Sequence, residues 1–185
     1  MLYSILSLIV DSVASFLGSI LLLRFWMQAI QLRPPSSLAQ FTFALTDWLV
    51  KPLRRVVAGF GGYDWASLIG AVIIVSLLGT IEAWLEGRFW WPMILMLSIS
   101  FLLRWIFYGL MGIILIGVVF SWVNPYAPMA PFIYALGNPL MRPLRRIIPP
   151  IGNVDLSPMV ALLALQILLS LSLGLVGTLI SAIAA

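Results

Sequence analysis

Residues 156–185 read LSPMVALLALQILLSLSLGLVGTLISAIAA and contain no charged side chain. A helix crosses the hydrocarbon core of a bilayer with about 20 consecutive apolar residues, at a rise of about 1.5 Å per residue. The whole chain of 185 residues has a matching composition, with 63% hydrophobic residues, 9% charged residues and a mean hydropathy of +1.14. A soluble domain carries about 25% charged residues. The composition therefore predicts an all-α integral membrane protein.

Two more segments have the length and apolarity of a membrane span. Residues 2–26 are interrupted by Asp11 and, near their end, by Arg24. Residues 65–85 carry one charge, Glu82, near one end. Both segments are long enough to cross a bilayer, so we predict a span at each.

The middle of the chain, residues 89–123, is apolar throughout except for Arg104. One straight helix of this length would be about 50 Å long, whereas the hydrocarbon core is about 30 Å thick. We therefore predict a span at 105–123, with a tryptophan near each membrane interface, and a separate interfacial segment at 92–103. The alternative is one long tilted helix. With a final span at 156–183, the chain has about four transmembrane helices.

The basic residues are concentrated in two long connections, residues 30–64 and 124–155. Loops rich in Lys and Arg stay on the cytoplasmic side of a membrane, so we predict that both connections are cytoplasmic. Two spans separate them, which agrees with a shared side, and both termini then lie outside. The net charge of +4 is explained by this bias, and we expect no nucleic acid partner.

The two connections repeat one another. Residues 51–57, KPLRRVV, align with residues 142–148, RPLRRII, and the same offset carries Asp64 onto Asp155. Residues 1–88 and 89–185 thus form two tandem repeats, each with the order span, amphipathic interfacial helix, basic turn, span. Because each repeat has an even number of spans, the two repeats run parallel.

Residues 37–48 show the periodicity of an amphipathic helix that is too short to span a membrane. Apolar residues recur on one side of it, at Leu38, Phe41, Leu45 and Trp48. We predict that this helix, and a weaker counterpart around residues 132–140, lie on the inner leaflet. Each helix is expected to end at the proline of the basic motif, Pro52 or Pro143, because proline lacks a backbone donor.

The repeated basic motifs are the first candidate site. Their simplest role is to hold the loops inside and to touch anionic headgroups, at about 1 kcal/mol per residue. Scattered charges would retain a loop equally well, so the repeated Pro-Leu-Arg-Arg order also favours a docking surface for lipid headgroups or for an acidic segment of a partner. The candidate residues are Lys51, Arg54, Arg55, Arg142, Arg145 and Arg146.

Asp64 and Asp155 each stand immediately before an apolar run. A carboxylate there can accept hydrogen bonds from the first amides of the following helix and favours its positive end. We predict that both are helix caps. A catalytic or ion-binding aspartate is the alternative.

Three charges inside the predicted spans form a second candidate cluster. Asp11, Glu82 and Arg104 fall at comparable depths in the outer half of the bundle. We predict that they approach one another, as a structural clamp or as one wall of an ion path. The alternative is that Arg104 extends to the headgroups and Asp11 lies near solvent.

The doubled motif resembles the YggT family of small bacterial membrane proteins, which has plastid relatives. Residues 23–26, LRFW, and 121–123, SWV, also resemble the family pattern, so the likeness covers nearly the whole chain. The first copy departs from the second where Ala58 aligns with Pro149. The resemblance implies a bacterial inner-membrane protein. It also implies a role in osmotic or other extracytoplasmic stress, with links to potassium, or in assembly, as for the plastid relatives.

The chain has no His and no Cys, which excludes imidazole and thiolate metal sites and Ser-His or Cys-His catalysis. We expect no cofactor and no enzymatic activity. The leading interpretation is a non-enzymatic inner-membrane scaffold, assembly or stress-response factor. Its expected partners are anionic lipids, a membrane protein and a second copy of the chain. The alternative is a channel or transporter component for a small cation such as potassium, acting as an oligomer.

Overall fold

The computed structural model describes residues 2–57, 59, 61–85, 87, 90–148 and 155–184. Within these ranges the chain forms six helices and no strand, which confirms the predicted all-α class. Four of them are long and apolar enough to cross a membrane, as predicted. The helices are α1 (Leu2–Ala29), α2 (Ser36–Val56), α3 (Trp65–Leu85), α4 (Trp91–Val123), α5 (Ala130–Ile147) and α6 (Ser157–Ala184).

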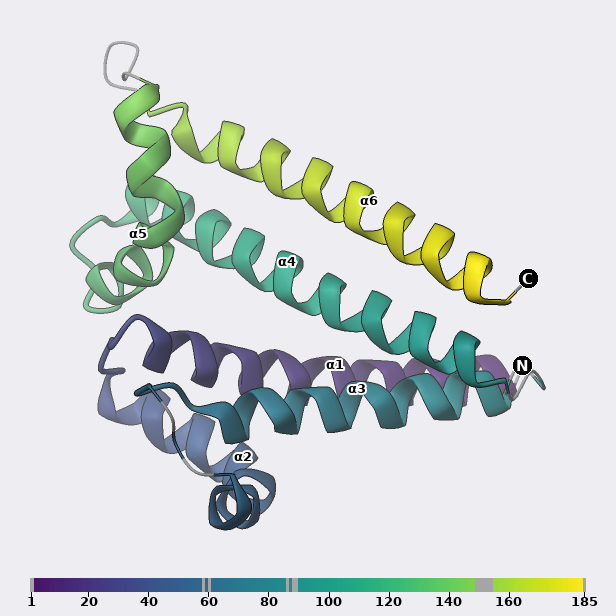
Figure 1. Cartoon of the computed structure of the whole chain (residues 1–185). Coiled ribbons are helices and arrows are strands. Elements are labelled where there is room, and N and C mark those ends of the chain that lie inside the picture. Colours follow the sequence, from purple (N-terminus) through teal and green to yellow (C-terminus); the bar gives the residue numbers. More distant parts are fainter. Residues whose placement is uncertain are drawn as a thin grey trace.

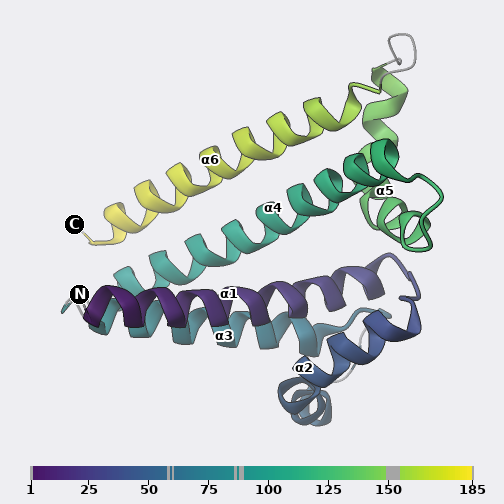
Figure 2. The same cartoon turned by 180° about the vertical axis from the view of Figure 1, so that it is seen from behind.

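The four long helices run side by side, and the two amphipathic helices lie at the same end, α2 beside α1 and α3, and α5 beside α4 and α6 (Figure 1). Helix α1 packs on α3, and α4 packs on α6, while contacts of α4 with α3 and α1 join the two repeats. Both termini lie at the end opposite α2 and α5, and the view from behind shows the same arrangement (Figure 2). The two basic motifs, far apart in the sequence, are therefore brought to one end of the bundle.

Helix α4 is one continuous helix of 33 residues. The separate interfacial segment predicted at 92–103 is therefore wrong, and the long helix left as the alternative is what forms. Its proline, Pro92, stands in the first turn, where a helix tolerates a residue without a backbone donor. No proline interrupts it between Met93 and Val123. A helix longer than the bilayer core is accommodated by tilting.

Close approaches at two glycines bring α4 against the first repeat. The ring of Trp105 lies over Gly18 of α1, in the space that a Cβ there would occupy. The indole Nε1 of Trp105 donates to Ser15 Oγ at 2.9 Å. A Cβ at Gly79 of α3 would lie 3.1 Å from the carbonyl oxygen of Ile94. These contacts, together with buried Val75 and Leu78, fix α4 on α1 and α3.

Helices α2 and α5 continue through the prolines at which we expected them to end. Helix α2 contains Pro52 and ends at Val56, and α5 contains Pro139 and Pro143 and ends at Ile147. All three prolines are exposed, so the carbonyl groups that they leave without a helical partner can be satisfied outside the protein. The dibasic pairs consequently occupy the last turn of each helix, where cations favour the negative end.

Helix α2 turns its polar side inward. Thr42, Thr46 and Val50 are buried, whereas Phe41 and Trp48, on the other side, are 52% and 60% exposed. This orientation is typical of a helix whose aromatic side meets lipid and whose polar side meets a polar group of the protein. That polar group is supplied by α1.

Candidate functional site

The first arginine of each dibasic pair binds an aspartate further along the chain. Arg54 Nη2 lies 2.8 Å from Asp64 Oδ2, and Arg145 Nε lies 2.8 Å from Asp155 Oδ2. The two repeats thus form the same contact at the same sequence spacing. Each ion pair connects the end of an amphipathic helix to the start of the next long helix. We call these two ion pairs the clasps.

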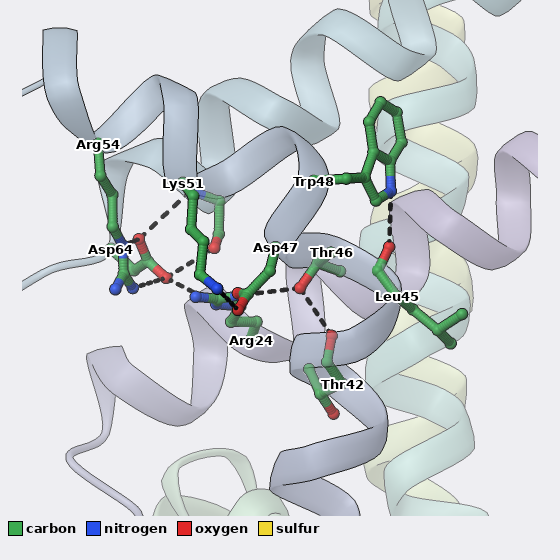
Figure 3. A network of polar contacts seen from close by, with 10 residues as sticks. Arg24, Thr42, Leu45, Thr46, Asp47, Trp48, Lys51, Arg54 and Asp64 are labelled. Carbon is green, nitrogen blue, oxygen red and sulfur yellow. Dashed lines mark hydrogen bonds and ion pairs between the residues drawn. The ribbon is translucent and has the colours of Figure 1, made fainter.

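The clasp of the first repeat belongs to a buried network around Arg24 of α1 (Figure 3). Arg24 is 5% exposed. Its Nε donates to Asp64 Oδ2 at 3.2 Å, and its Nη1 donates to Asp47 Oδ1 at 2.8 Å and to Thr46 Oγ1 at 2.7 Å. The guanidinium also lies 4.7 Å from the centre of the Phe43 ring. One buried cation thus joins α1, α2 and the start of α3.

Asp47 is shared between a buried and an exposed cation. Besides Arg24, it binds Lys51 Nζ at 3.0 Å, one turn further along α2. Burial raises the pKa of Asp47, but the hydrogen bonds and charges of Arg24 and Lys51 outweigh that effect and hold the pKa below its usual value. Asp47 therefore stays ionised and balances the charge on Arg24.

Asp64 combines the clasp with a cap of α3. It accepts hydrogen bonds from Ser67 Oγ at 2.6 Å and from the Ser67 backbone amide at 3.4 Å. Burial raises its pKa, but hydrogen bonds from Arg54 and Ser67, and the charges of Arg54 and Arg24, lower the pKa below the usual value. Asp64 therefore holds two arginines and the start of a membrane helix.

Asp155 performs the same two roles in a more open setting. It accepts a hydrogen bond from the Ser157 backbone amide at 2.9 Å, at the start of α6. Burial raises its pKa, but hydrogen bonds from Ser157 and Arg145 keep the pKa below the usual value. Its side chain is 38% exposed, compared with 2% for Asp64. The second clasp is therefore more exposed than the first.

The second repeat lacks the buried cation. When the tryptophans of the two repeats, Trp26 and Trp122, are aligned, Phe120 stands in the place of Arg24. In the register of the basic motifs, Asn138 stands in the place of Asp47. Both members of the buried ion pair are thus replaced by uncharged residues. This substitution explains why the second clasp has no buried partner.

The six basic candidates fall into two groups. Lys51, Arg54 and Arg145 bind carboxylates of the chain itself. The other three are exposed, and none of them has a carboxylate within 4.0 Å in the part of the chain that the structure describes. We call them the free arginines: Arg55, Arg142 and Arg146.

The three charges predicted to cluster inside the membrane form no ion pair with one another within the described ranges. Glu82 instead accepts a hydrogen bond from Ser7 at 2.9 Å, and Asp11 accepts one from Ser15 at 3.2 Å. Arg104 is exposed. In the described structure the two carboxylates are therefore hydrogen-bonded by serines, and no ion pair joins either of them to Arg104.

The sequence interpretation missed Arg24, Thr46 and Asp47 as members of a site. In the sequence Arg24 stands only as an interruption near the end of a predicted span. The available signal was the pairing tendency: an arginine within an apolar span often pairs with a carboxylate. Asp47 supplies one from the polar side of the neighbouring amphipathic helix.

A family model described as CCB3/YggT matches residues 3–85 and 96–176. The chain belongs to the CCB3/YggT family. The two matched segments fall in the first and second tandem repeats, and each of them includes one clasp. The predicted family is thereby confirmed.

Bacterial relatives match along most of their length. The uncharacterized protein PA0392 of Pseudomonas aeruginosa is 36% identical over 86% of this chain and 84% of its own length. The uncharacterized protein YggT of Escherichia coli K12 is 32% identical over 88% and 86%. An uncharacterized protein of Haemophilus influenzae is 30% identical over 92% and 93%. No solved structure shows significant similarity to the chain.

Proposed function

We propose that this CCB3/YggT protein is a non-enzymatic scaffold of the bacterial inner membrane. It holds anionic lipid and a membrane-protein partner at the end of the bundle that carries α2 and α5, in an assembly or stress-response role. The observation that carries the proposal is the presence of the free arginines on both amphipathic helices at one end of the bundle (Figure 1). The bias of basic residues toward that end supports a cytoplasmic orientation.

The buried network supports a scaffold because it holds α2 in place without occupying its outer side. Arg24 binds both Asp47 and Asp64, while Phe41 and Trp48 remain exposed on the other side of α2. A rigid helix with an unoccupied aromatic and basic side is suited to recruitment. The stress and assembly roles of the family, implied by the resemblance, agree with such a surface.

The proposal is tested by photocrosslinking in living cells. Probes at Leu53 and Leu144 would be unsuitable because both side chains pack against the protein core. Val56 and Ile147, in corresponding places of the two repeats, are 85% and 77% exposed. A probe at Leu175, exposed on α6 near the other end, is the matched control.

We expect a discrete protein adduct from Val56 or Ile147 and none of the same size from Leu175. The adduct should disappear when Arg55 and Arg146 are replaced by Gln, in a chain that still inserts normally. Identical adducts from all three positions, or an adduct that persists in the variant, would refute recruitment through these arginines.

The second candidate function is a component of a cation channel or transporter. Polar contacts at Glu82 and Asp11, near the end that carries the termini, favour it. Toward the other end, however, α1, α3 and α4 close over buried Val75 and Leu78. A path along one chain would have to cross this apolar layer, so the function requires several copies. Potassium flux into proteoliposomes tests it, and no flux above protein-free vesicles would reject it.

A further inference from the structure

The two arginines of each dibasic pair have different surroundings. Arg54 and Arg145 form the clasps. Their neighbours Arg55 and Arg146 are exposed, and no described carboxylate lies within 4.0 Å of either. Adjacent residues of a helix point about 100° apart, at 3.6 residues per turn. The repeated motif therefore pairs one half-exposed arginine with an aspartate of the chain and leaves the next arginine, on a different side of the helix, without such a partner.

On α2 the outward arginine belongs to an aromatic row. Phe41, Trp48 and Arg55 follow one another at intervals of about two helical turns, so they share one side of the helix. Phe41 and Trp48 are more than half exposed, and Arg55 is exposed as well. On α5, Arg146 follows Pro139 at the same interval, and both are exposed. Each outward arginine thus extends a row of exposed residues.

The neighbours of the outward arginines are apolar. Val56 follows Arg55 and is 85% exposed, and Ile147 follows Arg146 and is 77% exposed. Exposed Val, Ile and Trp beside a cation suit the boundary between acyl chains and headgroups, where Trp is enriched. An acidic protein segment or a nucleic acid would instead favour a polar rim. The surroundings therefore select a lipid as the occupant.

We propose that Arg55 and Arg146 each bind the phosphate of an anionic phospholipid, while Arg54 and Arg145 hold only their aspartates. A guanidinium presents a planar set of donors that fits two phosphate oxygens. Trp48 and Val56 contact the acyl chains beside the headgroup on α2. This assignment rests on the proposed function and names the lipid contacts of the same surface.

The test measures lipid retention by the purified full-length protein with native mass spectrometry. The probes are phosphatidylglycerol and phosphatidylcholine with identical acyl chains. Arg55→Gln and Arg146→Gln, singly and together, are compared with Arg33→Gln, which removes one exposed positive charge from the α1–α2 connection. The melting temperature of every variant is recorded, because a loss of fold would also release lipid.

We expect the wild type to retain phosphatidylglycerol over phosphatidylcholine. Its affinity should fall about fivefold for each outward arginine removed, with unchanged melting temperature, while Arg33→Gln stays within about twofold of the wild type. Retention unchanged in the double variant would overturn the proposal. An equal loss of retention in Arg33→Gln would also overturn it, because retention would then depend only on the number of positive charges. Equal retention of the two lipids by the wild type would overturn it as well.

Lipid retention and the cellular crosslink together distinguish the lipid assignment from the proposed scaffold function. If lipid retention is unchanged while the cellular adduct from Val56 or Ile147 is lost in the double variant, the arginines bind a protein and the lipid assignment is wrong. If lipid retention falls as expected and no adduct forms, the lipid site stands and the partner scaffold fails.

Discussion

Arg54 binds the carboxylate of Asp64, with Nη2 2.8 Å from Oδ2, and so joins the end of α2 to the start of α3. The same relationship recurs between Arg145 and Asp155 in the second repeat. The contact gives a physical reason for the order of the basic motif. One arginine closes the loop onto the next membrane helix, which leaves the adjacent arginine available at the surface.

The first prediction concerns the different burial of the aspartates in the two clasps. Asp64→Asn leaves buried Arg24 and half-exposed Arg54 with one carboxylate fewer, so the free energy of unfolding should fall by about 3 kcal/mol. Asp155→Asn breaks an exposed pair and should lower it by less than about 1 kcal/mol. Denaturation of both variants in mixed micelles provides the measurement. Equal losses would show that burial of Asp64 is unimportant.

The second prediction concerns acid. The pKa values of Asp47, Asp64 and Asp155 lie below their usual value in the folded protein. Their contribution to stability is therefore complete above the unfolded pKa of about 3.9 and is lost as the pH falls through the folded pKa values. The melting temperature should stay level from pH 7 to about pH 5 and fall below about pH 4.

Asp64→Asn provides the control for the acid response, because it removes one of the three carboxylates. The melting temperature of this variant should start lower and decline less with acid than that of the wild type. A parallel decline in both proteins would mean that Asp64 does not contribute to the pH dependence.

The third prediction concerns the contact between α1 and α4. In Gly18→Ala the new methyl group would overlap the ring of buried Trp105. The free energy of unfolding should therefore fall by about 1–3 kcal/mol. Gly112→Ala on α4 is the matched control, because nothing lies within 4 Å of a Cβ there. If both variants are as stable as the wild type, the packing of Trp105 on Gly18 is not formed in the membrane.

The fourth prediction concerns sidedness. The chain contains no cysteine, so single introduced cysteines report without background. Cysteines at Val56 and Ile147 should react with an impermeant reagent from one side of the membrane, and cysteines at Ser4 and Ser181 from the other. Labelling of intact cells and of inverted vesicles distinguishes the sides. The proposed cytoplasmic orientation of α2 and α5 predicts that Val56 and Ile147 react only in the vesicles. Opposite sides for Val56 and Ile147 would contradict the shared face.

The membrane architecture could be predicted from the sequence because its signals are local. A charge-free run such as residues 156–185 identifies a span by composition alone. The repeated basic motif identified the two halves of the chain, and the position of the aspartates before apolar runs identified the helix starts. Each of these patterns is contained within a few helical turns.

The network around Arg24 could not be found in the same way, because its members are separated in the sequence. Arg24 meets Asp47 and Asp64 only when α2 folds back with its threonine side against α1. The amphipathic pattern of α2 does not say which side meets the protein. The continuity of α4 has a different explanation. Length alone favours a shorter span in a bilayer core about 30 Å thick, whereas the tilted helix, the alternative, is what forms.

The central claim is that adjacent arginines of one motif have different roles. The most direct test compares the melting temperatures of Arg54→Gln and Arg55→Gln in the same detergent. Loss of a hydrogen-bonded charge costs about 1.5–3 kcal/mol, which for a chain of this size lowers the melting temperature by about 3–12 °C. We predict such a decrease for Arg54→Gln and a change below about 1 °C for Arg55→Gln, since exposed substitutions have small effects. Equal decreases in the two variants would contradict the division of roles.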